Sequence, residues 1–133
     1  MRAHDGRVVP AFICEALDNK PLTVFGDGSQ TRSFCFCSDL VRGIRLLLSS
    51  EYSLPLNLGN PDEMSILRFA YLVNQVVGNA AAIVHKPLPV DDPKVRRPDI
   101  ARAREILGWE PQVGLEEGLA QTIRWFRRVL ESR

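Results

Sequence analysis

The sequence predicts an α/β protein in which helices and short strands alternate along one domain. Three observations indicate this class: apolar residues recur at helical spacing, short β-branched or aromatic runs lie between these segments, and glycine or proline ends the runs. The 133 residues show no internal repeat or low-complexity tract. We therefore expect a single unit with a small mixed sheet and about five helices.

The first elements are a helix and a strand. Apolar residues predict a helix over Val8–Leu17, in which Pro10 is acceptable because it lies in the first turn. The run "LTVF", Leu22–Phe25, predicts a strand that ends at Gly26. After the segment "GDGSQTR", the run "SFCFC" at 33–37 predicts a second strand.

The middle of the chain continues this alternation. Ser38 is a good N-cap for the helix "DLVRGIRLLLSS", in which Gly43 indicates close packing. The run "LPLNLG" at 54–59 predicts a strand. Ser65 is then expected to cap a helix that Gly78 ends. The inward face expected for the first of these two helices comprises Leu40, Val41, Ile44, Leu47 and Leu48.

A long loop separates the last strand from two further helices. The run "AAIVHKPL" at 81–88 predicts a strand, and the three prolines of Pro89–Asp99 predict an extended surface loop. Asp99 is expected to cap the short helix "IARAREIL", which Gly108 closes. A last helix, with apolar residues at core spacing, begins near Leu115.

Composition and cysteine spacing exclude several classes of function. The 17 basic and 16 acidic residues leave a net charge of +1, so we expect no nucleic-acid or membrane partner. Cys35 and Cys37 are too close for the usual zinc half-site, and Cys14 stands alone. We expect three buried or half-buried free thiols, no metal, no membrane span and a cytoplasmic location.

The segment Gly26–Arg32, "GDGSQTR", has two interpretations. Its glycines permit close backbone approach, its Ser, Gln and Thr residues add donors, and Arg32 offers a planar fork that matches two phosphate oxygens. An ordinary hairpin loop with a surface arginine would need much the same residues. The heptapeptide alone leaves both interpretations open.

A second cationic cluster lies at Lys94–Asp99, "KVRRPD". Its three cations within four residues can converge on a diphosphate or a carboxylate, although charge runs are usually solvated faces. Two separate arginine loops in so nearly neutral a chain favour one shared anionic ligand.

Five strings resemble the C-terminal part of the extended short-chain dehydrogenase/reductase family: "DGRVVPAFICEALDNKPLTVFGDGSQTRSF", "SDLVRGI", "LNLGNPDE", "DDPKVRRPDIARAREILGWEP" and "LEEGL". Within that family the chain is most similar to the UDP-glucuronate decarboxylases, mainly through "DDPKVRRPD" and "DGRVV". The dTDP-glucose 4,6-dehydratases and UDP-glucose 4-epimerases are the alternatives. The resemblance implies a nucleotide-sugar-binding C-terminal domain over residues 1–133, without the N-terminal Rossmann half.

The resemblance also implies a chemistry and a set of site residues. In the decarboxylases, NAD oxidises the sugar at C4, CO2 leaves, and the hydride then returns. The segment Thr23, Val24 and Phe25 is expected to lie along the uracil, with Phe25 packed on the base. Arg32 is expected to hold the pyrophosphate, and Arg96, with Arg97 beside it, the sugar phosphate or carboxylate. Arg7 is a weaker candidate for the substrate side.

The 133 residues contain neither the G-x-x-G-x-x-G turn nor the Tyr-x-x-x-Lys pair of the family's oxidising half. We therefore expect no catalytic or cofactor-binding residue here, no NAD bound by this chain alone and no decarboxylation. Its expected partners are a UDP-sugar and either a second copy or full-length subunits. Three interpretations remain: part of a decarboxylase, a non-enzymatic UDP-sugar-binding or subunit-pairing module, or a fragment without a role of its own.

Overall fold

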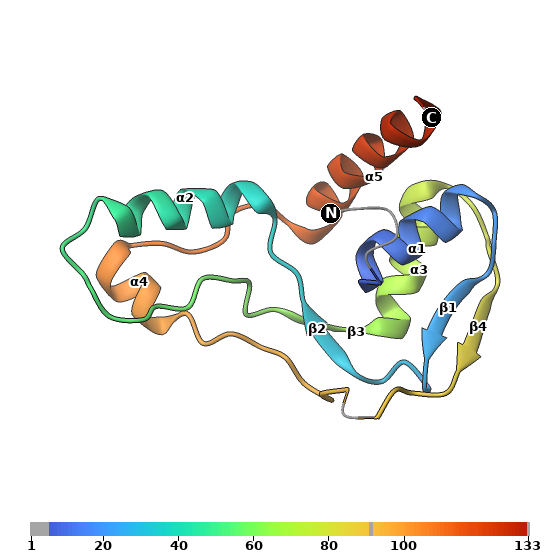
Figure 1. Ribbon diagram of the computed structural model, residues 1–133, viewed down its shortest axis with the longest axis horizontal. Helices are drawn as coiled ribbons and strands as arrows, with labels where there is room; N and C mark the ends of the chain where they lie inside the picture. The colour runs from blue at the N-terminus through green and yellow to red at the C-terminus, as the bar shows by residue number, and fades with distance from the viewer. Residues whose placement is uncertain (1–5, 91, 133) are drawn as a thin grey trace.

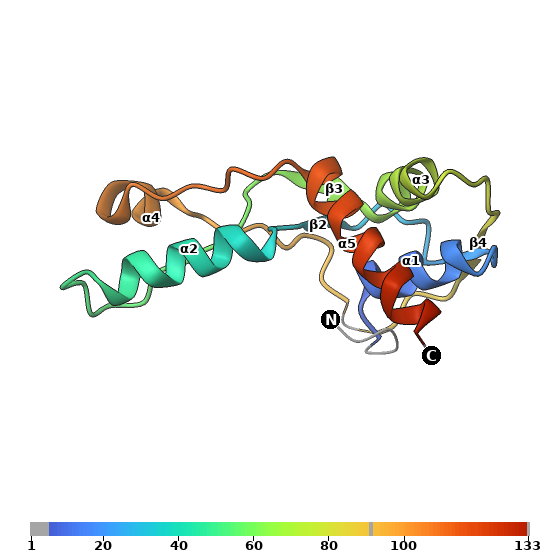
Figure 2. The same ribbon diagram turned by 90° about the horizontal axis from the view of Figure 1, so that it is seen from above.

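The structure, a computed structural model, describes residues 6–90 and 92–132 and confirms the α/β class with five helices in this part (Figure 1). The molecule is elongated in both views, with three helices and one sheet at one end and two helices at the other (Figures 1 and 2). In chain order the elements are α1 Val8–Leu17, β1 Leu22–Phe25, β2 Thr31–Ser33, α2 Cys37–Leu48, β3 Glu63–Ser65, α3 Ile66–Val77, β4 Ile83–Lys86, α4 Ala101–Leu107 and α5 Leu115–Glu131.

The strands form two separate two-stranded sheets. β1 pairs with β4 in parallel, with Leu22 opposite Ile83, whereas β2 pairs with β3 antiparallel, with Thr31 opposite Ser65. The segment Gly26–Arg32 therefore links strands of different sheets. The hairpin interpretation is wrong, because β1 and β2 pair with other strands.

One apolar cluster, the main core, joins α1, α3, α5 and β1. The helical stripes predicted from the sequence meet there, and Phe69 stacks on both Phe12 and Phe34 at centroid distances of 6.0 and 4.4 Å. Its fully buried residues are Phe12, Ile13, Ala16, Leu22, Val24, Ile66, Phe69, Ala70, Val73, Leu119, Ile123 and Phe126.

Several predicted boundaries are confirmed by their local contacts. α1 and β1 have the predicted bounds, and the hydroxyl of Ser65 accepts a hydrogen bond from the Arg68 N–H at 3.2 Å, as an N-cap should. The prediction for α4 was off by one residue: the helix begins at Ala101 with Ile100 as its N-cap, so Asp99 is not the cap, although its Oδ1 accepts from the Ala101 N–H at 2.9 Å. Among the described residues between β4 and α4, 87–90 and 92–100, no regular element forms, as the prolines predicted.

The other end of the molecule is an arm (residues 37–60 and 99–111) made of α2, α4 and the segments that connect them. Its small core consists of Ile100, Ala103 and Trp109. A Cβ at Gly43 would lie 2.9 Å from Leu58 and 3.0 Å from Trp109 Nε1, which confirms the predicted close packing. The arm is thus held together around the indole of Trp109.

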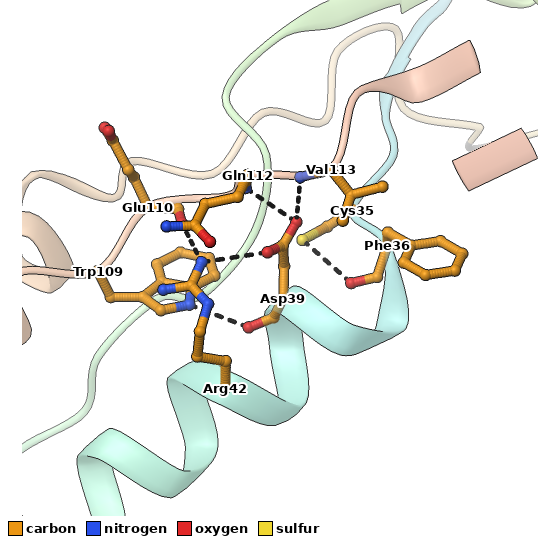
Figure 3. A network of polar contacts seen from close by, with 8 residues as sticks. All are labelled: Cys35, Phe36, Asp39, Arg42, Trp109, Glu110, Gln112 and Val113. Carbon is orange, nitrogen blue, oxygen red and sulfur yellow. Dashed lines mark hydrogen bonds and ion pairs between the residues drawn. The ribbon is translucent and has the colours of Figure 1, made fainter. Parts of the chain in front are cut away.

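A buried carboxylate fixes the arm to the segment that leads into α5 (Figure 3). Asp39 is 2% exposed, and its carboxylate accepts hydrogen bonds from the N–H groups of Gln112 and Val113 at 3.0 and 2.9 Å. The same carboxylate forms an ion pair with Arg42 at 3.1 Å. The indole N–H of Trp109 donates to the Asp39 carbonyl at 2.9 Å. Burial works to raise the pKa of Asp39, but these donors outweigh it and hold the pKa below its ordinary value.

Two strand predictions were wrong. In place of the strand expected at 33–37, the structure has β2 at Thr31–Ser33, so only Ser33 lies in both. β2 is short because its partner β3 has three residues, and β3 itself was not predicted. The run at 54–59 forms no strand, since no described segment pairs with it.

The predictions for the start and the inward face of α2 were also wrong. α2 begins at Cys37 instead of after Ser38, and its N-cap, Phe36, has no side-chain hydrogen bond. Leu40 and Leu47 are half-buried, whereas the remaining members of the expected face are exposed, because no described segment covers that side. They are Val41, Ile44 and Leu48, at 55%, 49% and 80% exposure.

The three cysteines are free, as expected, but only Cys14 and Cys35 are half-buried, whereas Cys37 is exposed at the first turn of α2. Across residues 6–90 and 92–132, no group of three or more His, Cys, Asp or Glu residues is arranged to hold a metal ion. No helix in the same ranges is long and apolar enough to cross a bilayer.

Candidate functional site

An open cavity of about 960 Å³ lies between the start of α1, strands β1 and β2, and the loop 89–98. We call it the arginine cavity, because four arginines line it: Arg7, Arg32, Arg96 and Arg97. Three aromatic side chains, Phe12, Phe25 and Phe34, line the same space. The cavity therefore combines an apolar surface with a concentration of positive charge.

Six of the seven residues predicted for substrate binding line this cavity. Thr23 and Phe25 do so from β1, together with the four arginines. Val24 does not, because neighbouring residues of a strand point to opposite faces and its side chain is fully buried in the main core. The structure thus brings together residues that lie up to 90 positions apart in the sequence (Arg7 and Arg97).

The backbone of β1 has few free groups for a ligand. The Thr23 N–H donates to Glu15 Oε2 at 3.0 Å, and the Phe25 carbonyl accepts from Gln30 Nε2 at 2.9 Å. The phenyl ring of Phe25, 44% exposed, offers the larger contact surface. An aromatic face of this kind can stack on a planar base.

The segment Gly26–Arg32 uses most of its own polar groups internally. The Asp27 carboxylate accepts from both the N–H and the hydroxyl of Ser29, which lowers the pKa of Asp27. The hydroxyl of Thr31 donates to Glu63 at 2.8 Å. The side-chain donors that the sequence predicted for a phosphate are therefore occupied by acceptors of the chain itself.

The same segment supports the start of α3. The carbonyls of Gly28 and Gln30 accept hydrogen bonds from the N–H groups of Leu67 and Ile66, both at 3.0 Å. These two N–H groups would otherwise lack partners within the helix. The glycine-rich loop is thus a helix cap, and only Arg32, at its end, points its charge at the cavity.

The three arginines near the loop 89–98 differ in how they are held. The Arg32 guanidinium contacts the Asp92 carboxylate at 2.5 Å and the carbonyls of Thr31 and Pro93 at 2.7 Å. Arg97 lies 3.8 Å from Glu63, with 61% of its side chain exposed. The guanidinium of Arg96 is exposed and has no hydrogen-bond or ion-pair partner within the part of the chain that the structure describes.

Two lining residues were missed by sequence reasoning. Asp92 belongs to the string "DDPKVRRPD", but no residue near it in the sequence indicates that it pairs with Arg32, 60 residues earlier. Cys35 lines the cavity too, but burial, followed by the nearby Asp39 carboxylate, raises the pKa of its thiol to about 11. Cys35 therefore stays protonated near neutral pH and is a poor nucleophile.

Comparison with known proteins assigns the class of this chain. Residues 1–59 match the sequence model of the NAD dependent epimerase/dehydratase family. The chain belongs to this family of extended short-chain dehydrogenases/reductases and corresponds to a C-terminal portion of its members.

Two curated relatives carry a narrower name than the family does. UDP-glucuronic acid decarboxylase 1 of Danio rerio is 53% identical over 131 residues, which cover 98% of this chain and 31% of that protein. UDP-glucuronic acid decarboxylase 4 of Arabidopsis thaliana is 49% identical over 93% of this chain and 28% of that protein. The chain thus spans about a third of the length of the curated relatives it matches.

Solved structures share the fold of this portion. A UDP-glucose 4-epimerase of Thermotoga maritima, with UDP-glucose, has a TM-score of 0.89 at 31% identity, over 93% of this chain and 40% of that one. A UDP-glucuronic acid 4-epimerase of Bacillus cereus, in complex with UDP-glucuronic acid and NAD, has a TM-score of 0.87 at 28% identity, over the same shares.

The family implies NAD, but the residues of this chain do not fit a dinucleotide. Its 133 residues include no G-x-x-G-x-x-G turn, and the donors of the one glycine-rich loop are occupied by the chain itself. The carbonyls of that loop face the N-terminus of α3, where a pyrophosphate would need N–H donors instead.

Proposed function

We propose that this chain is the nucleotide-sugar-binding part of an NAD-dependent UDP-glucuronate decarboxylase. The observation that carries the proposal is the arginine cavity, in which an exposed phenyl ring and four guanidinium groups line one open space. Phe25 contacts the uracil, while the arginines bind the diphosphate and the sugar carboxylate. A UDP-sugar needs this combination of an aromatic surface and positive charge.

The roles of the arginines follow from their contacts. Arg96 is the main ligand of the phosphate or carboxylate, because its guanidinium is exposed and unpaired among the described residues. Arg32 binds the diphosphate and also holds the loop 89–98 through Pro93 and Asp92. Arg97 and Arg7 add charge at the rim of the cavity.

The relatives favour decarboxylation over epimerisation. The curated decarboxylases reach 53% identity with this chain, whereas the solved 4-epimerases named above reach 31%. A UDP-sugar 4-epimerase is the second candidate, because its portion of the same fold superposes with a TM-score of 0.89. Both candidates bind the same nucleotide.

Replacing Arg96 by alanine is expected to weaken UDP binding about 10- to 100-fold and to leave uridine binding unchanged. The reason is that a charge-assisted hydrogen bond contributes about 1.5–3 kcal/mol, and only UDP carries the phosphates. Titration calorimetry of the 133-residue chain with UDP and with uridine measures both affinities.

The matched control is Arg124→Ala, which removes an exposed arginine of α5 outside the cavity. Arg32→Ala is expected to weaken UDP binding at least as much as Arg96→Ala while leaving it measurable, since it removes a ligand and a support of the loop. Equal affinities for UDP and uridine in the unmodified chain would contradict the proposal, as would an equal loss in the Arg124 variant.

The 133-residue chain is expected not to convert UDP-glucuronate into UDP-xylose when NAD+ is supplied. Its sequence contains no dinucleotide turn and no Tyr-x-x-x-Lys pair to bring the cofactor to the sugar. Chromatography of the nucleotide sugars after a long incubation is the measurement. Turnover above the level of a heat-denatured sample would refute this expectation.

A subunit-pairing role is the second function that an observation favours. Val41, Ile44 and Leu48 expose one apolar side of α2, and exposed apolar surface favours association. In this reading the chain pairs with a second copy or with full-length subunits and still binds the UDP-sugar.

A further inference from the structure

Among the described residues that line the arginine cavity, one carboxylate, that of Asp92, opposes the positive charge. Asp92 lines the cavity and forms an ion pair with Arg32, with Oδ1 and Nη2 2.5 Å apart. The pair is largely shielded from water, because the Arg32 side chain is 15% exposed and that of Asp92 27%. Screening by salt is therefore weaker for this pair than for surface ion pairs.

The ion pair occupies part of the guanidinium that a phosphate would use. An arginine has five N–H donors, and three hydrogen bonds of Arg32 go to Asp92, Thr31 and Pro93. Two of these partners are neutral carbonyls, so Asp92 supplies the only negative charge among them. A phosphate that binds Arg32 has to share the guanidinium with this carboxylate or replace it.

Three hydrogen bonds that do not involve Asp92 also hold the loop beside β2. The Thr31 N–H donates to the Lys94 carbonyl at 2.9 Å, Arg32 Nη1 donates to the Pro93 carbonyl, and the Ser33 hydroxyl donates to the Arg96 carbonyl at 3.1 Å. Each of the three residues of β2 thus bonds the loop independently of Asp92. The carboxylate can leave Arg32 while the loop stays in place.

We propose that Asp92 is an internal counterion that competes with the phosphates of a nucleotide diphosphate for the guanidinium of Arg32. The inference rests on the proposed function and adds a control of affinity to the same site. Binding exchanges the carboxylate on Arg32 for a phosphate, so the gain in binding free energy is smaller than an unpaired arginine would provide. Asp92 in this way weakens binding of the nucleotide and favours its release.

The test compares the affinities of the 133-residue chain and its Asp92→Asn variant for UDP and uridine by titration calorimetry. Asparagine removes the charge but keeps the shape of the side chain. We expect UDP to bind about tenfold more tightly to the variant, since a negative charge near the phosphates is gone, and uridine to bind equally to both. Asp62→Asn, which makes the same change of net charge outside the cavity, is the control and should have no effect.

A double-mutant cycle shows whether Arg32 carries the effect. The gain from Asp92→Asn should disappear in the Arg32→Ala background if the two anions compete for that guanidinium. Unchanged or weaker UDP binding by Asp92→Asn, while the unmodified chain prefers UDP to uridine, would overturn the inference and make Asp92 a residue that positions Arg32. An undiminished gain in the Arg32→Ala background would overturn it as well. No preference for UDP in any of the proteins would refute the proposed function and, with it, this inference.

Discussion

Replacing Asp39 by alanine is expected to lower the free energy of unfolding by about 2–5 kcal/mol, since it removes the buried acceptor of two backbone donors and the partner of the partly exposed Arg42 guanidinium. The Gln112 and Val113 N–H groups and the Arg42 guanidinium would each lose a partner at about 3 Å. Urea unfolding followed by tryptophan fluorescence measures the effect, because Trp109 lies against the same residue. The matched control, Asp62→Ala, removes an exposed carboxylate and should change the stability by less than about 0.5 kcal/mol.

The same carboxylate makes the protein sensitive to acid in a defined direction. The pKa of Asp39 is lower in the folded state than in the unfolded chain, so its contribution is complete above the unfolded value of about 3.9. The contribution is lost as the pH falls through the lower folded value. The difference in stability between the unmodified chain and Asp39→Ala should therefore narrow at low pH. A difference that stays constant down to pH 2 would show that the charge of Asp39 is not what stabilises the arm.

Replacing Gly28 by alanine is expected to cost about 2–5 kcal/mol, from backbone strain and a collision together. Gly28 has φ +76°, and its Cβ would lie 2.8 Å from both Leu67 Cβ and Val24 Cγ1. Neither neighbour can yield easily, since Leu67 lies in the first turn of α3 and Val24 is fully buried. Thermal and urea unfolding of the variant measure the cost.

Two other glycines separate the two causes. Gly78→Ala imposes a positive φ, +85°, where nothing lies within 4 Å of the Cβ, and Gly114→Ala imposes neither strain nor collision. Stability should fall least for Gly114→Ala and most for Gly28→Ala. If Gly28→Ala lowered the stability no more than Gly78→Ala does, the collision with α3 would contribute nothing to the cost of the substitution.

The sequence predicts best what depends on local residues. α1 and α3 have their predicted bounds because the helical spacing, the first-turn Pro10 and the caps Ser65 and Gly78 all lie within or beside the helix they define. Strands depend on a partner elsewhere in the chain. β3 was missed and the run at 54–59 was misassigned, since nothing in three or six residues indicates whether another segment pairs with them.

The same division applies to the site. Arg32 and Arg96 could be singled out from short motifs, and both line one cavity. The contacts that decide how each arginine is used could not be predicted, because Asp92 and Pro93 reach Arg32 across 60 residues or more. The expectation that Thr31 offers a donor to a phosphate failed for the same reason, since its hydroxyl donates to Glu63, 32 residues later in the chain.

The separation between the arm and the main core has a consequence for how the molecule unfolds. The buried residues of the arm cluster are distinct from those of the main core, so each can open as a cooperative unit of its own. The arginine cavity takes Leu40 and Leu58 from the arm and Phe12 and Thr23 from the other end. A nucleotide sugar that contacts both walls would couple the unfolding of the arm to that of the main core. The more tightly the ligand binds, the more cooperative the unfolding of the whole chain would become.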